Sequence, residues 1–233
     1  MRGLPFLDER LALLASLVRA GSIAADIGSD HGHLITWLVG RGVCPHGYAC
    51  DINKKPLEQS RATALRFGCE GKISFVLSNG LAELNEADID DIIIAGMGGD
   101  LIAEILSAAG WHSAGKQFLL QPMTRADELR RWLCANGYEL CSEHAAQANG
   151  FCYTAITSRY TGKVYPCTPL FAAVGIMPQV RTPEAKAYIL KQAEAVKKKL
   201  LGLAASKNHL ADEMLPLQGL YDSILATLEE TSP

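Results

Sequence analysis

Three polar residues of this sequence lie at the ends of short apolar segments. Asp26 and Asp51 end the first two segments, and Asn79 closely follows the third. In a parallel sheet the carboxyl ends of the strands meet at one edge, where α/β proteins bind their ligands. A carboxylate there accepts hydrogen bonds from both hydroxyls of a ribose, and an Asn amide reads the edge of an adenine. The three positions therefore predict a nucleotide-binding edge.

The turn after the first segment reads Gly28-Ser29-Asp30-His31-Gly32, and a predicted helix follows it. Glycines let a ligand approach the backbone, and a helix N-terminus offers free N–H groups. A dinucleotide-binding turn has the pattern G-x-G-x-x-G and receives a pyrophosphate. The acids Asp26 and Asp30 disfavour a pyrophosphate but suit the sulfonium and α-ammonium groups of S-adenosylmethionine.

A second glycine cluster, Gly96-Met97-Gly98-Gly99, follows the fourth apolar segment. Three glycines in four positions exclude side chains, leave room for a flat group and expose backbone amides that can orient it. The fifth segment ends at Gln121, which adds a polar side chain at the same edge.

Apolar segments alternate with segments of helical spacing from Leu11 to about Thr157, which indicates a parallel sheet covered on both faces. The predicted strands are Ile23–Ile27, Gly47–Cys50, Ile73–Leu77, Asp91–Ala95 and Gln117–Leu120. The predicted helices are Leu11–Val18, Leu34–Leu38, Leu57–Phe67, Leu101–Ala108 and Ala126–Asn136. Tyr138–His144 and Phe151–Ser158 have no helix between them, so we expect an antiparallel hairpin at the sheet edge.

The character of the sequence changes after Arg159. Tyr160–Pro183 contains four prolines and predicts a linker with one short helix. Two heptad-spaced apolar series then predict an antiparallel coiled-coil hairpin. Its turn is expected at residues 206–208, and Pro216 is expected to kink the second helix or mark where its regular part begins. We therefore expect an S-adenosylmethionine-binding α/β domain over residues 1–160 and a linker with a coiled-coil domain over residues 161–233.

The composition is that of a globular protein, with 233 residues, 48% hydrophobic and 20% charged. No apolar run approaches the ~20 residues of a membrane span, and the N-terminus lacks a signal peptide's apolar block. A soluble cytoplasmic protein without membrane partners is expected. Seven cysteines without a C-x-x-C pair indicate reduced thiols. The spacings of Cys44 with Cys50, and of Cys134 with Cys141, do not match zinc fingers, so no metal is expected.

The net charge of −3 conceals an uneven distribution. Residues 1–160 carry 14 basic and 18 acidic side chains, residues 161–210 carry 8 and 2, and residues 211–233 carry 0 and 5. The basic stretch suits backbone phosphates. Alternatively, it is a solvated helix face balanced by an acidic partner helix. Arg125, Arg130 and Arg131, near the predicted carboxyl edge, would add contacts to a nucleic acid.

The segments DIGSDHGHL, AGMGG, LLQP and RRWL-x-x-NGY resemble the TrmK family of bacterial tRNA (adenine-N1)-methyltransferases. The resemblance covers about Arg10 to Ile156. It implies a Rossmann-like class I S-adenosylmethionine-dependent domain joined to a C-terminal coiled coil. It also implies methylation of N1 of one adenine in the D-arm region of tRNA, position twenty-two in the family's substrate. The sequence departs from the family at Asp51, where a glutamate is common, and at Gly32, where alanine is usual.

The resemblance also implies roles for particular residues. Asp26, Gly28 and Asp30 with His31 would border the methionine part of the cofactor, and the Ala95–Gly99 loop would border the target base. The expected cofactor contacts are Asp26, Gly28, Ser29, Asp51 at the ribose, Ile52, Asn79 at the adenine, Gly80, Ala95 and Gly96. The expected substrate contacts are Met97, Gly98, Gly99, Gln121, Arg125, Arg130, Lys191 and Lys198.

Adenine N1 has a lone pair that attacks the methyl group in line, so alignment and desolvation supply most of the catalysis. Asp30 is the first candidate for a carboxylate that stabilises the cationic base or accepts a proton from N6. His31 is either a second catalytic candidate or a residue that bonds the backbone at the helix start. The target base must be unpaired to expose N1, and Met97 would form an apolar wall beside it.

Three alternatives remain open from the sequence. A methyltransferase acting on another RNA or a small molecule would need no basic appendage. A nicotinamide-dependent dehydrogenase would explain the sheet and Asp51, but the acidic turn opposes it. A non-catalytic RNA-binding protein would not need all three polar strand ends. We expect tRNA as the partner and favour a monomer, with the oligomeric state open.

Overall fold

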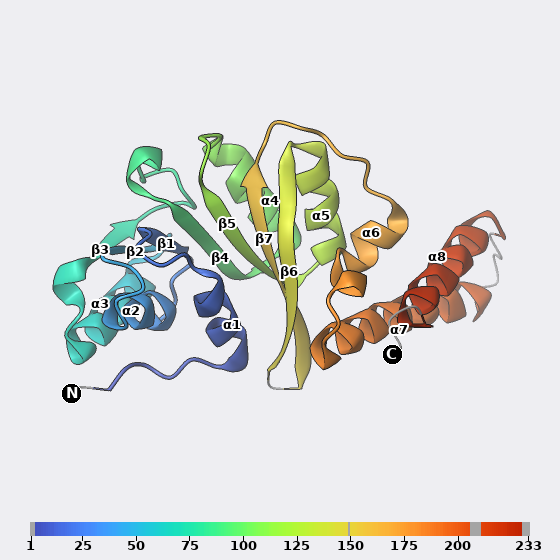
Figure 1. Cartoon of the computed structure of the whole chain (residues 1–233), viewed down its shortest axis with the longest axis horizontal. Coiled ribbons are helices and arrows are strands. Elements are labelled where there is room, and N and C mark those ends of the chain that lie inside the picture. The colour runs from blue at the N-terminus through green and yellow to red at the C-terminus, as the bar shows by residue number, and fades with distance from the viewer. Residues whose placement is uncertain (1–2, 149, 206–210, 230–233) are drawn as a thin grey trace.

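A computed structural model describes residues 3–148, 150–205 and 211–229. Within them lies a seven-stranded sheet in the order β3-β2-β1-β4-β5-β7-β6 (Figure 1). The first five strands along the chain are parallel, and β7 is antiparallel to β5 and β6. This confirms the predicted mostly parallel sheet with a terminal hairpin. The strands are β1 Ala24–Ile27, β2 Gly47–Asp51, β3 Ile73–Leu77, β4 Asp91–Gly98, β5 Gln117–Thr124, β6 Tyr138–Ala148 and β7 Phe151–Tyr160.

Helices cover both faces of the sheet (Figure 1). Apolar residues of α1, α2 and α3 join one core cluster, and those of α4 and α5 join the cluster on the opposite face. The helices are α1 Glu9–Leu17, α2 His33–Gly40, α3 Lys54–Phe67, α4 Gly99–Ala109 and α5 Ala126–Ala135; two 3₁₀ turns are η1 Glu70–Lys72 and η2 Glu86–Asp88. The predicted helices are all present, with ends that differ by a few residues.

Two strands are longer than predicted. β4 continues through the glycine segment to Gly98, and β5 continues to Thr124. The sequence indicated a loop after Ala95 because glycine weakens strands. The ladder nevertheless continues, with register shifts on both sides of Met97, which pairs with Pro122. The glycine segment is therefore an irregular strand end rather than a free loop.

The pairing of the central strands places their carboxyl ends side by side. Ile27 of β1 lies opposite both Cys50 of β2 and Ile94 of β4. Asp51 lies opposite Leu77 of β3. The residues that follow these positions are the ones expected to form a site, so the parallel register brings the turns after β1, β2, β3 and β4 to one edge.

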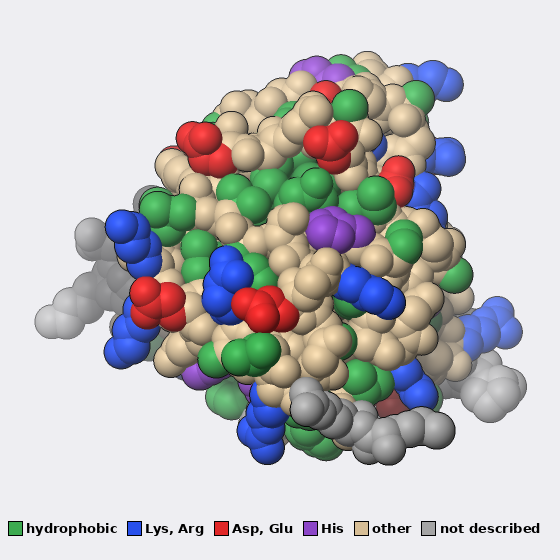
Figure 2. Space-filling model, turned by 90° about the vertical axis from the view of Figure 1, so that its left-hand side faces the viewer, with side chains coloured by type: hydrophobic (Ala, Val, Ile, Leu, Met, Phe, Trp, Pro, Cys, Tyr) green, Lys and Arg blue, Asp and Glu red, His purple; other side chains and the backbone are tan. Residues whose placement is uncertain are grey.

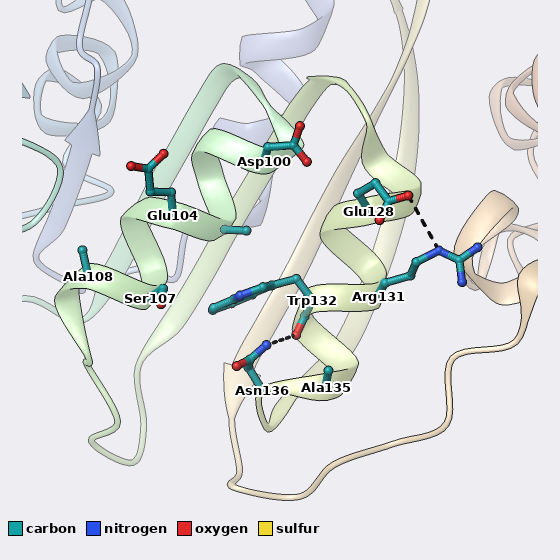
Figure 3. A pocket seen from close by; sticks show the side chains of 10 residues that line it. Asp100, Glu104, Ser107, Ala108, Glu128, Arg131, Trp132, Ala135 and Asn136 are labelled. Atoms are coloured by element: carbon teal, nitrogen blue, oxygen red, sulfur yellow. Dashed lines mark hydrogen bonds and ion pairs between the residues drawn. The ribbon is translucent and has the colours of Figure 1, made fainter.

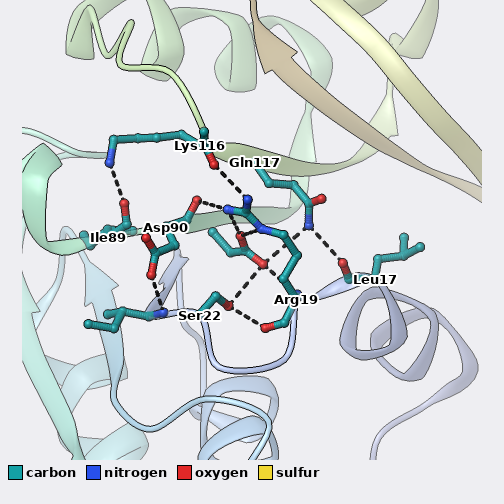
Figure 4. Close-up of polar contacts among 10 residues, drawn as sticks. Leu17, Arg19, Ser22, Ile89, Asp90, Lys116 and Gln117 are labelled. Atoms are coloured by element: carbon teal, nitrogen blue, oxygen red, sulfur yellow. Dashed lines mark hydrogen bonds and ion pairs between the residues drawn. The ribbon is translucent and has the colours of Figure 1, made fainter.

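A polar network ties the elements together at the opposite, amino edge of the sheet (Figure 4). The carboxylate of Asp91 is buried and accepts from the backbone N–H of Arg19 at 2.8 Å and from Arg19 Nε at 2.7 Å. Gln117 Nε2 donates to the Leu17 carbonyl at 2.9 Å. These bonds fix the connection between α1 and β1 against the starts of β4 and β5.

The chain beyond β7 is helical, as predicted. The helices are α6 Pro169–Val174, α7 Pro183–Ala205 and α8 Ala211–Glu229, with a 3₁₀ turn η3 Met177–Gln179 between α6 and α7. Figure 1 shows α7 and α8 side by side, projecting beyond β6. The predicted positions Ile189, Ala193, Val196 and Leu200 are buried with Ile224 of α8. The turn predicted at 206–208 lies outside the described residues, and Pro216 lies inside α8. No helix among the described residues is long and apolar enough to cross a membrane.

A buried ion pair joins this helical segment to the sheet. Arg130 of α5 and Glu143 of β6 both have side chains that are 0% exposed, and Arg130 Nη2 lies 2.6 Å from Glu143 Oε1. Arg130 Nη1 also donates to the Ala172 carbonyl of α6 at 2.7 Å, and Nη2 contacts the Tyr188 hydroxyl of α7 at 2.8 Å. The expectation that Arg130 contacts substrate is therefore wrong: its guanidinium is enclosed by protein acceptors.

Arg130→Ala is expected to lower the free energy of unfolding by about 3–5 kcal/mol, because Glu143 stays buried without its counter-charge. The matched control is Arg131→Ala. Arg131 is partly exposed and its Nε lies 4.0 Å from Glu128, so its loss is expected to cost less than about 1 kcal/mol. Urea unfolding monitored by circular dichroism measures both. Equal costs for the two variants would contradict the structural role of Arg130.

Candidate functional site

Asp26 is a buried carboxylate at the carboxyl end of β1. It is 7% exposed, and Ser29 Oγ donates to its Oδ2 at 2.8 Å. Burial raises the pKa of Asp26 to about 6, while the Ser29 hydrogen bond and the positive charge of Arg10 act in the opposite direction. Ser60 of α3 fixes the turn by donating a hydrogen bond from its Oγ to the Ser29 carbonyl at 2.6 Å. The site thus contains a carboxyl group whose pKa is raised by burial to about 6, well above its ordinary value.

The backbone of the turn after β1 is packed against its neighbours. The N–H groups of Gly28 and Ser29 donate to the Cys50 carbonyl of β2 at 2.8 and 2.9 Å. Gly28 has a φ of +74°, and Met97 Cε occupies the space where a Cβ would stand. The positive φ favours glycine at this position, and its missing side chain leaves room for the Met97 methyl group. The predicted cofactor turn and the predicted base loop are therefore in contact.

Asp30 and His31 form the exposed tip of the turn. Their side chains are 68% and 53% exposed, and His31 Nε2 lies 3.6 Å from Asp30 Oδ1. His31 has a φ of +60°, an uncommon conformation for a residue with a side chain. Helix α2 begins at His33 with Gly32 as its N-cap residue. The pair is free to meet a ligand, which keeps both catalytic candidates available.

Asp51, Ile52, Asn79 and Gly80 lie at the ends of β2 and β3. Asp51 Oδ1 accepts from the Asn53 N–H at 2.8 Å, which orients the carboxylate, while Ile52 is 61% exposed. Asn79 is exposed and lines a small cavity of about 90 Å³ with apolar residues of α4, including Leu101 and Ile105. A polar amide beside an apolar wall is an arrangement that can receive a purine.

The glycine segment contains one glycine that is exposed to solvent and one that is buried. Gly96 is exposed, and its N–H donates to Gln121 Oε1 at 3.0 Å. Gly99 is buried, and a Cβ there would collide with the Arg125 carbonyl. Gly99 therefore permits close packing of α4 on the start of α5, and the expectation that it contacts substrate is wrong. Ala95, Met97 and Gly98 are partly exposed beside Gly96.

Gln121 hydrogen-bonds to other protein groups and orients the glycine segment. It is 1% exposed, and its Oε1 accepts from both the Gly96 N–H and Arg10 Nη1, the latter at 2.8 Å. Its Nε2 donates to the Pro122 carbonyl at 3.1 Å. The expectation that Gln121 binds substrate is wrong because protein groups occupy its amide.

Arg10 is the site residue that sequence reasoning missed. The predicted helix began at Leu11, whereas α1 begins at Glu9 with Asp8 as its N-cap residue. The side chain of Asp8 accepts from the Leu11 N–H at 2.8 Å. An Asp before an apolar helical repeat is a helix-start signal that would have placed Arg10 on the helix. Its partner Gln121 is 111 residues away and carries no such signal.

The remaining expected substrate contacts lie on two separate surfaces. Arg125 is exposed at the start of α5, where its Nε lies 2.9 Å from Asp100 Oδ2. Lys191 and Lys198 are exposed on α7, beyond the sheet edge. Lys191 Nζ donates to the Cys152 carbonyl of β7 at 2.7 Å. Arg125 therefore lies beside the glycine segment, where its carbonyl packs on Gly99, whereas Lys191 and Lys198 lie on the C-terminal helix α7.

A groove of about 700 Å³ lies between α4 and α5 (Figure 3). It runs from Asp100 past Trp132 to Asn136, and its rim carries Asp100, Glu104 and Glu128. Three carboxylates against the single cation of Arg131 give the groove a net negative charge, which disfavours phosphate groups. Within the described part of the chain, no group of three His, Cys, Asp or Glu side chains could hold a metal ion. The described thiols of Cys44, Cys50, Cys134 and Cys141 are free.

The chain matches known methyltransferases in sequence and in structure. Residues 7–156 match the family model of the methyltransferase domain. A Bacillus subtilis (strain 168) tRNA (adenine(22)-N(1))-methyltransferase is 33% identical over 153 residues, which span 65% of this chain and 64% of that relative. The aligned part is thus slightly less than two thirds of the relative's length.

Solved structures extend the similarity to the C-terminal helices. A Streptococcus pneumoniae protein described as a candidate tRNA (m1A22) methyltransferase superposes with a TM-score of 0.84 at 29% identity, covering 96% of this chain and all of the other. The same protein in complex with S-adenosyl-L-methionine gives 0.81. The M. capricolum TrmK in complex with S-adenosyl-homocysteine gives 0.78 at 26% identity, covering 97% of this chain and 99% of the other. The chain belongs to the methyltransferase-domain family, and it is similar over almost its whole length to a solved TrmK structure.

Proposed function

We propose that the protein transfers a methyl group from S-adenosylmethionine to N1 of an adenine in the D-arm region of tRNA. The observation that carries the proposal is the carboxyl edge of the sheet, where the buried acid Asp26 and the oriented acid Asp51 lie on neighbouring strands. The B. subtilis relative is a tRNA (adenine(22)-N(1))-methyltransferase, which supports the substrate and the reacting atom. The similarity to a structure in complex with S-adenosyl-L-methionine supports the methyl donor.

The residues at this edge fit S-adenosylmethionine. The donor is cationic at its sulfonium and ammonium groups, and the partly desolvated carboxylate of Asp26 offers the opposite charge. Asp51 would hold the ribose hydroxyls with the carboxylate that Asn53 orients. Asn79 would face the adenine beside Leu101 and Ile105. Gly28, Ser29, Ile52, Gly80, Ala95 and Gly96 would complete the contacts through backbone and apolar groups.

The donor supplies an electrophilic methyl group on a good leaving group, so adenine N1 displaces it directly through its lone pair. The protein's task is then to align the base, exclude water and stabilise the positive charge that develops on it. Asp30 carries the exposed carboxylate at the tip of the turn and is the proposed group that faces this charge. His31, 3.6 Å from Asp30, is the second candidate.

The target base would be received by the glycine segment. Gly96 exposes its backbone, and Met97, which packs on Gly28, supplies an apolar surface between the cofactor turn and the base. N1 lies on the Watson–Crick edge, so the adenine must leave any pairing to enter. Gly98, at the start of α4, would border the same space.

The exposed lysines of α7 are proposed to bind the phosphate groups of the tRNA backbone. Lys191, Lys197, Lys198 and Lys199 are exposed along this helix, and Arg125 offers another exposed cation. By contrast, the face at the β3 end of the sheet carries acidic and basic side chains intermixed (Figure 2). We assign cofactor binding and chemistry to residues 1–160 and RNA binding to residues 161–233, in a cytoplasmic protein for which a monomer is favoured and the oligomeric state is open.

Acid pH is expected to weaken binding of S-adenosylmethionine. Asp26 loses its charge as the pH falls through about 6, and a protonated carboxyl no longer attracts a cation. Calorimetry is expected to give a dissociation constant about tenfold higher at pH 5 than at pH 7.5. The isosteric control Asp26→Asn is expected to bind weakly at both pH values. A wild-type constant that does not vary with pH would contradict the role of Asp26.

Asp30→Ala is expected to retain binding of S-adenosylmethionine and to reduce methyl transfer about 100-fold, the range of a positioned acid–base group. Methylation of unmodified tRNA, followed by nucleoside analysis for N1-methyladenosine, measures the reaction. Glu58→Gln, an exposed acid of α3, is the control and is expected to keep full activity. Full turnover by Asp30→Ala would remove Asp30 from the catalytic role.

The role of α7 is tested in the intact chain, because removing residues after 162 would strip Arg130 of its α6 and α7 partners. The double variant Lys191→Gln/Lys198→Gln is expected to weaken tRNA binding. It should also reduce the slope of log Kd against log salt concentration by about 1 to 2. Each phosphate contact that is lost means that about one counterion fewer is released when the tRNA binds. Lys72→Gln, far along the chain in η1, is the control. A salt slope equal to that of the wild type would refute the proposed grip.

A further inference from the structure

Arg10 brings a guanidinium from α1 to the carboxyl edge of the sheet. Its Nη1 donates to Gln121 Oε1 of β5 at 2.8 Å, and its side chain is 20% exposed. Helix α1 gives it a firm base, because Leu14 and Ala15 are buried in the core and Asp8 caps the helix. Arg10 is therefore held by packing on one side and by a charge-assisted hydrogen bond on the other.

Gln121 connects Arg10 to the glycine segment through hydrogen bonds. The oxygen that accepts from Arg10 also accepts from the Gly96 N–H at 3.0 Å. A Gln amide has two chemically different ends, and a guanidinium offers only donors. Arg10 therefore keeps the oxygen, and not the NH₂ group, directed at Gly96. Gln121 is 1% exposed with Arg10 in place, so both hydrogen bonds to its oxygen come from protein donors, and losing one of them is costly.

Arg10 also faces the other half of the site. Its positive charge acts on the carboxyl of Asp26, and a Cβ at Gly96 would lie 3.9 Å from Arg10 Nη1. The guanidinium thus stands near both the acid proposed for the methyl donor and the backbone proposed for the target base. An in-line transfer requires the methyl donor and the target base to be held in a fixed position relative to one another.

We propose that Arg10 is a positioning residue that, through Gln121, holds the Gly96–Met97 segment in the geometry that receives the target adenine. The proposal deepens the proposed function and rests on it for its kinetic consequences. The hydrogen-bond chain itself is independent of the substrate. Its effect on the backbone can be measured without any methyl transfer.

Arg10→Gln is the test variant, with Glu9→Gln on the same helix as the control. Arg10→Gln is expected to lower kcat for tRNA methylation about 10- to 100-fold, with KM for tRNA within about threefold of wild type, because misplacement affects the reacting geometry rather than RNA binding. Arg10→Lys retains a charged donor and is expected to recover part of kcat. Gln121→Ala is expected to show the same loss. The double variant Arg10→Gln/Gln121→Ala should lose no more than either single variant, because the two residues act in one chain.

Amide hydrogen exchange of the wild type and the variants supplies the second measurement. Exchange at residues 95–98 is expected to accelerate in Arg10→Gln and to remain unchanged in Glu9→Gln, because the Gly96 N–H loses an oriented acceptor. If the wild type methylated no tRNA, the proposed function would fail while this exchange result would stand. A raised KM with unchanged kcat would make Arg10 a direct RNA contact and overturn the proposal. Unchanged exchange at residues 95–98 would also overturn it.

Discussion

The parallel register of β1, β2 and β4 is the constraint on which the rest of the site depends. Because Ile27 lies opposite both Cys50 and Ile94, the residues after these positions emerge side by side. In this way Asp26, Asp51 and the glycine segment, which are far apart in the chain, reach one edge of the sheet. The amino edge is held by the buried carboxylate of Asp91, which accepts two hydrogen bonds from Arg19.

Buried polar bonds then hold the edge in place. Gln121 joins α1 to the glycine segment through a single oxygen, and Ser29 joins Asp26 to the turn that follows it. The Arg130–Glu143 pair is a second buried centre, which connects the sheet to α6 and α7. A buried charge needs its partner, so the proposed RNA-binding helix depends on this pair for its attachment to the domain that carries the site.

Much of the fold was predictable because local patterns carry it. The alternation of apolar and helical segments predicted the parallel sheet and its terminal hairpin, and the heptad spacing predicted α7 and α8. The ends of β4 and β5 were not predictable. Their continuation depends on pairs such as Met97 with Pro122, which form only when the two strands meet.

The sequence alone determined which chemistry the edge offers: Asp26, Asp30 and Asp51 follow from residue type and strand position. Tertiary structure decided which of the other polar residues are available to a ligand. Arg130, Gln121 and Gly99 were expected at the substrate but are enclosed, because partners 111 and 13 residues away, or a backbone carbonyl, fill the space around them. Arg10 entered the site for the same reason. Burial and hydrogen-bond pairing depend on distant contacts, which local spacing does not encode.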